Sequence, residues 1–91
     1  MTISVAEKRR EFRRPTGGIV HLKITTPRPF EVLGRLLDIS EGGFRMTHNY
    51  TPLAAGQVVE FRHHENSGTA RVVWNRILGD RVETGFVVVT D

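Results

Sequence analysis

The chain has 91 residues, of which 38% are hydrophobic and 25% charged, and its formal net charge is +3. This length and composition indicate one globular domain and do not suggest a disordered chain. The chain contains no cysteine, which excludes disulfide bridges, cysteine-based zinc sites and thiol catalysis, and no apolar run approaches the roughly 18–20 residues of a membrane span.

Residues 1–18 are polar and basic and end in Pro15-Thr16-Gly17-Gly18, so we expect them to form a flexible N-terminal arm. The N-terminus lacks the apolar core of a signal peptide, and we therefore expect a cytoplasmic protein. The small positive charge favours an anionic partner, either a phosphorylated small molecule or a nucleic acid.

Residues 19–91 show the alternation of apolar and polar side chains that is typical of half-buried strands. In the first of these strands, Val20, Leu22 and Ile24 alternate with polar residues, and no later segment carries a helical stripe. We predict six strands, over residues 19–25, 30–37, 44–48, 58–63, 69–75 and 81–89, with turns at 38–43, 51–56, 66–68 and 78–80. This spacing predicts an all-β fold, a closed or nearly closed six-stranded antiparallel β-barrel.

Four arginines in the arm are spaced as two pairs. Arg9 and Arg13 are four residues apart, and so are Arg10 and Arg14. This spacing places each pair on one face of a helix and also on one face of an extended chain, so either conformation forms a two-pronged clamp. A guanidinium group makes bidentate hydrogen bonds to phosphate and to the O6/N7 edge of guanine. The alternatives are a solvated charged tail and a non-specific nucleic-acid tether.

The segment 38–43 is a predicted turn with polar side chains. Asp38 and Ser40 occupy alternate positions as the second strand ends, so both side chains can point the same way. The Asp38 carboxylate can accept hydrogen bonds from the N1–H and amine of guanine, and Ser40 can donate to a phosphate or cap the turn. Gly42 and Gly43 allow positive φ and a close approach of a ligand to the backbone. The alternative is an ordinary β-turn, because these residue types are common in turns.

The remaining polar residues do not form a catalytic or metal-binding pattern. No histidine is placed by the sequence as a base for Ser40, and we expect no enzymatic activity. The four histidines are dispersed, and the adjacent His63 and His64 would face opposite sides of a strand, so we predict no metal site. Trp74 follows Ala70 and Val72 in an alternating pattern, which favours a place in the core over a role as a stacking platform for a base.

The arginine pairs and the segment 38–43 together resemble the two motifs of the PilZ domain family, bacterial receptors for cyclic di-GMP. That family carries Arg-x-x-x-Arg in an N-terminal segment and Asp/Asn-x-Ser-x-x-Gly after the second strand. In this chain, Arg9 to Arg13 and Asp38 to Gly43 resemble these motifs, and Arg10 matches a frequent additional arginine. Arg10 with Arg14 offers a second register of the first motif. The similarity continues through the later segments 53–58, 70–74 and 84–86.

The resemblance implies a non-catalytic receptor that binds cyclic di-GMP and uses no other cofactor. Its expected ligand-binding residues are Arg9, Arg10, Arg13, Asp38, Ser40, Gly42 and Gly43, with Arg14 and Trp74 as secondary candidates. Arg9 and Arg13 would hold phosphates and guanine edges, and Asp38 and Ser40 would recognise a guanine. Binding would fold the arm over the barrel and so signal to a partner protein. The alternative is a protein-interaction module or a small-barrel nucleic-acid-binding module that does not bind cyclic di-GMP.

Overall fold

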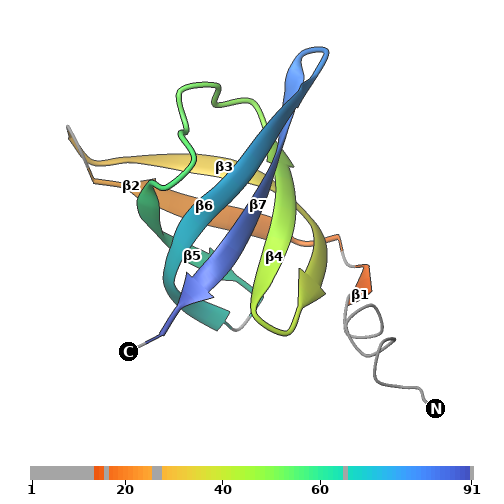
Figure 1. Cartoon of the computed structure of the whole chain (residues 1–91), viewed down its shortest axis with the longest axis vertical. Coiled ribbons are helices and arrows are strands. Elements are labelled where there is room, and N and C mark those ends of the chain that lie inside the picture. The colour runs from red at the N-terminus through yellow and green to blue at the C-terminus, as the bar shows by residue number, and fades with distance from the viewer. Residues whose placement is uncertain (1–13, 16, 26–27, 65, 91) are drawn as a thin grey trace.

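The strands pair in the order β1-β3-β2-β5-β6-β7-β4, and a further pairing of β3 with β4 closes the sheet into a barrel (Figure 1). The computed structural model describes residues 14–15, 17–25, 28–64 and 66–90. The strands are β1 (Arg14–Pro15), β2 (Ile19–Ile24), β3 (Phe30–Ser40), β4 (Gly43–His48), β5 (Val58–His63), β6 (Asn66–Leu78) and β7 (Arg81–Val89). Strands β2 to β7 form the barrel, so the predicted six-stranded antiparallel barrel is confirmed. Within the described residues, no helix is long and apolar enough to cross a membrane.

Strand β3 is shared by three partners along its 11 residues. Up to Arg35 it pairs with β2, and from Arg35 to Ser40 it pairs with β4. Near its end it also pairs with β1, which places Arg14 opposite Ile39 and Pro15 opposite Asp38. The point where the N-terminal segment joins the barrel therefore lies beside Asp38, a proximity that the sequence did not predict.

The hydrophobic core fills the barrel with side chains from alternate strand positions. Phe44 contacts three other rings there, with centroids 4.7 Å from Phe86, 5.0 Å from Phe61 and 4.8 Å from His63. The buried cluster consists of Val20, Leu22, Ile24, Val32, Leu36, Phe44, Met46, Leu53, Val59, Phe61, Ala70, Val72 and Phe86. The alternation predicted for the first strand is therefore confirmed.

Two predicted turns differ from the structure. Residues 38–40 continue β3, and only residues 41–42 form the turn before β4. Likewise, the predicted hairpin tip at 66–68 belongs to β6, which is longer than the predicted strand 69–75. Polar and glycine residues continue the strand at both places because the neighbouring strand supplies ladder partners for their backbone groups. Asp38 and Ser40 are therefore held on a strand and not on a loop.

A chain of hydrogen bonds joins β4, β6 and β7 to the segment between β4 and β5. The backbone N–H of Tyr50 donates to Nδ1 of His48 at 3.0 Å, so the neutral ring carries its proton on Nε2 and donates to Oγ1 of Thr84 at 2.7 Å. The Thr84 hydroxyl donates to Oδ1 of Asn75 at 2.6 Å, and Nδ2 of Asn75 donates to the carbonyl of Leu53 at 2.9 Å. Burial lowers the pKa of His48, which favours the neutral ring that these hydrogen bonds require.

The protein is expected to lose stability as the pH falls below about 6.5, the ordinary pKa of histidine. Burial lowers the pKa of His48, and burial with the neighbouring His64 lowers the pKa of His63. Between those lowered values and about 6.5, the unfolded chain binds protons that the native chain does not, so each buried histidine removes at most about 1.4 kcal/mol of stability per pH unit. Urea denaturation at pH 8 and pH 5 measures this loss.

The variant His48→Gln is the control, because a glutamine oxygen can accept from the Tyr50 N–H without titrating. The stability lost between pH 8 and pH 5 should be smaller in this variant than in the unaltered protein. An equal loss in both proteins would assign the acid sensitivity to groups other than His48.

Candidate functional site

Asp38 and Ser40 lie on the outer face of the barrel because β3 contains a bulge. The register between β3 and β4 shifts between Leu36 and Asp38. Before the shift, Leu36 lies in the core, and after it Ile39 packs against the core opposite Phe44. Asp38 and Ser40 therefore take the outward positions and share one face, as their spacing predicts. Without the bulge, the alternation that buries Leu36 would also have turned Asp38 inward.

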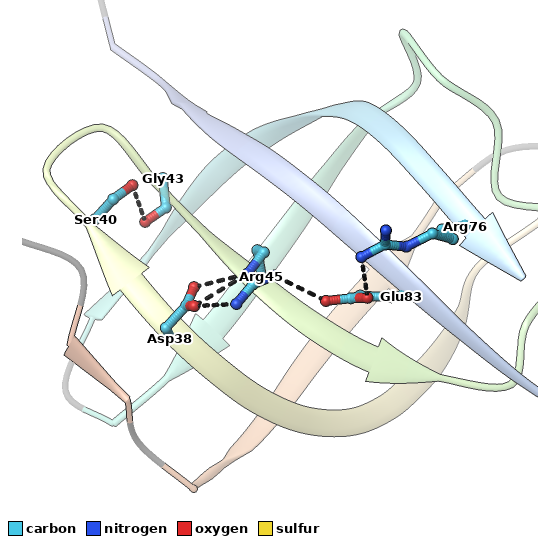
Figure 2. A network of polar contacts seen from close by, with 6 residues as sticks. All are labelled: Asp38, Ser40, Gly43, Arg45, Arg76 and Glu83. Atoms are coloured by element: carbon cyan, nitrogen blue, oxygen red, sulfur yellow. Dashed lines mark hydrogen bonds and ion pairs between the residues drawn. The ribbon is translucent and has the colours of Figure 1, made fainter. Parts of the chain in front are cut away.

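Asp38 is bound by Arg45, which projects from the neighbouring position of β4 (Figure 2). Nε of Arg45 lies 3.1 Å from Oδ1 and 3.0 Å from Oδ2 of Asp38, and Nη2 also donates to Oδ2. Nη1 of Arg45 donates to Oε2 of Glu83 on β7 at 3.0 Å, and Nη2 of Arg76 on β6 donates to Oε1 of Glu83 at 3.0 Å. Two acids and two arginines from four strands thus form one row of ion pairs.

The ion-pair row is partly shielded from water. The side chains of Asp38 and Glu83 are only 8% and 10% exposed, whereas that of Arg45 is 34% exposed. The hydrogen bond to Asp38 raises the pKa of Arg45, the carboxylates of Asp38 and Glu83 add to that effect, and burial opposes it. Arg45 is therefore a permanent cation between two carboxylates.

Arg45 and Glu83 were not among the site residues predicted from the sequence. Arg45 alternates with the core residues Phe44 and Met46, so its outward direction follows from the pattern. Its pairing with Glu83 spans 38 residues of sequence and depends on the register of β4 against β7. No local sequence signal carries that register.

The prediction that Trp74 lies in the core is wrong. The register between β6 and β7 shifts between Val72 and Trp74, so Trp74 follows the exposed Val73 onto the outer face and does not return to the core. Trp74 pairs with Gly85, where an added Cβ would lie 2.4 Å from the indole ring, so the ring covers this glycine. The Cζ atom of Arg76 lies 5.8 Å from the ring centroid. The half-buried indole therefore lies on the same outer face as the ion-pair row.

The two glycines of the predicted turn have different surroundings, and neither has positive φ; among the described glycines, only Gly56 and Gly79 do. The turn therefore does not use the positive φ that glycine allows. A Cβ on Gly43 would lie 2.0 Å from the carbonyl oxygen of Phe86, so Gly43 permits close strand contact. Gly42 has open space around it.

Ser40 and Gly42 connect the turn to its neighbours. Oγ of Ser40 donates to the carbonyl of Gly43 at 3.4 Å, and the carbonyl of Gly42 accepts from the N–H of Val88 on β7 at 2.8 Å. Ser40 therefore spans the turn, which is one of the two roles its hydroxyl was expected to play.

The predicted arginine motif falls mainly on the undescribed part of the chain. Arg9, Arg10 and Arg13 lie outside the described residues, and of Arg14 only the backbone is described, in β1. Most of the predicted arm, residues 1–18, is likewise outside the described residues. The described part shows where that segment meets the barrel, opposite Ile39 and Asp38.

Two surface depressions differ in their relation to the ion-pair row. The one of 330 Å³ lies on the same side and includes Arg35, Thr47 and Arg81, with Nε of Arg81 donating to Oγ1 of Thr47 at 3.3 Å. The larger one, of 490 Å³, is lined by residues of β2, β3, β5 and β6, with Lys23 and Arg62 opposed by two glutamates. The size of this second depression does not make it the site, because its charges offset each other. Among the described residues, no three histidine or acidic side chains are grouped as metal ligands.

Comparison with known proteins agrees with this architecture. The family model described as PilZ domain matches residues 7–91, which include the arginine pairs, the segment 38–43 and every barrel strand. Comparison with curated proteins gives no match. PilZ domains are generally cyclic di-GMP-binding domains and not enzymes. With nearly its whole length matched, on a barrel that carries Asp38 and Ser40 beside the end of the arginine segment, the chain belongs to the PilZ domain family.

Proposed function

We propose that this PilZ domain is a receptor for cyclic di-GMP that signals without catalysis. The observation that carries the proposal is the pairing of β1 with the end of β3, which brings the start of the described chain beside Asp38. The chain segment preceding Arg14 holds the arginines of the first motif, and Asp38 and Ser40 belong to the second. The pairing of β1 thus brings the end of the arginine segment, at Arg14, to the edge of the barrel that carries Asp38 and Ser40.

The chemistry of the outer face supports a guanine nucleotide as the ligand. Asp38 offers acceptor oxygens for the N1–H and amine of a guanine, and Ser40 offers a hydroxyl for a phosphate. Arg9 and Arg13, with Arg10, would hold phosphates and the O6/N7 edges of guanine. Gly42 leaves open space next to the turn, and Trp74 with Arg14 could add contacts to a second base or phosphate.

The proposed signal is a change in the N-terminal arm. Ligand phosphates would draw the arginines of residues 1–13 onto the outer face, and the folded arm would create a surface for a partner protein in the cytoplasm. Hydrogen exchange of the arm amides with and without ligand tests this step. Protection that appears only with cyclic di-GMP supports the proposal, whereas identical exchange in both states contradicts a switch of this kind.

Calorimetric titration of the full chain with cyclic di-GMP tests the function itself, with cyclic di-AMP as the control. We expect saturable binding of the guanine ligand in the micromolar range, about −8 kcal/mol, and much weaker binding of the adenine ligand. Steeply salt-dependent binding with no preference for either base would instead indicate an electrostatic module for nucleic acid. No binding by a folded chain would favour a protein-interaction module.

Alanine variants of the arm arginines should show which pair, Arg9 with Arg13 or Arg10 with Arg14, binds cyclic di-GMP. Arg9→Ala and Arg13→Ala are each expected to weaken cyclic di-GMP binding about tenfold or more, because each removes a charge-assisted hydrogen bond. Arg62→Ala is the matched control, since it removes an exposed arginine from β5, which neighbours neither β3 nor β4. A larger loss in Arg10→Ala and Arg14→Ala would assign the second register.

A further inference from the structure

The guanidinium of Arg45 is hydrogen-bonded to the Asp38 carboxylate, which is the group that would bind guanine in the proposed function. Its Nε lies 3.1 and 3.0 Å from the two oxygens of Asp38, and its Nη2 adds a further hydrogen bond to Oδ2. Guanine also presents two adjacent donors, N1–H and the exocyclic amine, which pair best with both oxygens of one carboxylate. The Asp38 side chain is only 8% exposed, so few directions of approach to these oxygens remain.

We propose that Arg45 competes with the ligand for Asp38, so that a guanine binds only after it displaces the guanidinium, and that this ion pair sets the ligand concentration at which the domain responds. The inference rests on the proposed function and adds a specific role for a residue outside both motifs. The competing ligand must present two adjacent hydrogen-bond donors to the carboxylate, and a guanine base meets that requirement.

Glu83 makes this displacement feasible. Nη1 of Arg45 already donates to Oε2 of Glu83 at 3.0 Å, through a nitrogen that does not contact Asp38. Arg45 can therefore release Asp38 and keep Glu83 as a charged partner, so that its guanidinium is not left unpaired on a partly buried surface. The released nitrogens would lie near the ligand, where they can face its phosphates. Arg76, at 3.0 Å from Oε1, holds Glu83 in position for this role.

Substitution of Arg45 separates competition from simple attraction of an anion. Arg45→Met removes the competitor together with one positive charge. Arg35→Met removes one positive charge from the same outer face, at an exposed position of β3 opposite Thr47, and leaves the Asp38 pair intact. If Arg45 competes, Arg45→Met should bind cyclic di-GMP about ten- to hundredfold more tightly than Arg35→Met, the factor expected for one hydrogen bond to a charged group. Equal or weaker binding by Arg45→Met would overturn the proposal.

A second measurement uses the unaltered protein, because Arg45→Met removes the cation between Asp38 and Glu83 and could therefore fold poorly. The Nε–H signal of Arg45, assigned by its loss in Arg45→Lys, reports directly on the hydrogen bond to Asp38. Saturating cyclic di-GMP should shift this signal and speed its exchange with water, and cyclic di-AMP at the same concentration should do neither. An Nε–H signal that stays in place while calorimetry shows saturable binding would overturn the competition but leave the receptor function intact. Absence of binding in calorimetry would overturn both.

Discussion

Replacing Gly43 with alanine is expected to lower the free energy of unfolding by about 3 kcal/mol, the upper part of the range for overpacking in a close-packed region. The added Cβ would lie 2.0 Å from the carbonyl oxygen of Phe86 and 3.2 Å from the Cα of Val87. Both atoms belong to the backbone of β7, which pairs with β4 along the whole length of β4. The strands can relieve the overlap only by moving apart, which breaks their hydrogen bonds.

Gly42→Ala is the matched control, because no atom lies within 4 Å of the position a Cβ would take there. Its effect on stability is expected to stay within about 0.5 kcal/mol. Urea denaturation followed by the fluorescence of Trp74, the one tryptophan in the chain, measures both variants. Equal stabilities would show that β4 and β7 can separate at this point without cost.

Gly42 and Gly43 of the predicted motif have different roles, because only Gly43 is in close contact with a neighbouring strand. Gly43 is required for strand contact whether or not a ligand binds, whereas open space around Gly42 leaves its backbone accessible. A loss of cyclic di-GMP affinity in Gly42→Ala, with stability unchanged, would therefore identify Gly42 as the glycine that the ligand approaches. Unchanged affinity would remove Gly42 from the proposed site.

Asp38→Ala is expected to weaken cyclic di-GMP binding about tenfold or more and also to destabilise the fold by about 1–3 kcal/mol. The loss of affinity follows from the missing acceptors for guanine. The loss of stability follows from the ion pair, because Arg45 would keep only Glu83 as a partner on a partly buried surface. The contact with Arg45 therefore gives Asp38 a structural role besides its proposed role in recognition of the base.

Asp38→Asn separates the two effects. It keeps the shape and one acceptor oxygen but replaces the other oxygen with a donor that repels the guanine amine and the Arg45 guanidinium. We expect intermediate stability and weak binding, measured by calorimetry at a temperature where thermal denaturation shows each variant to be fully folded. Binding of Asp38→Ala that equals that of the unaltered protein would exclude Asp38 as the residue that recognises the base.

The alternation of apolar residues was sufficient to predict the barrel strands and much of the core. In β2, for example, Val20, Leu22 and Ile24 are buried as the period-two pattern indicates. The two motifs were also visible in the sequence, because arginine spacing and the order Asp38, Ser40, Gly43 are local features. Each of these predictions rests on neighbours within a single segment.

Only the tertiary structure determined which way several key side chains point and what they contact. A bulge in β3 turns Asp38 outward and another in β6 removes Trp74 from the core, and neither bulge leaves a clear local signal. The ion pairs that join Asp38, Arg45 and Glu83 depend on the register of three strands, as does the place of β1 beside Asp38. Side-chain alternation specifies a face within one strand, whereas register and bulges are fixed by backbone hydrogen bonds to strands that are distant in sequence.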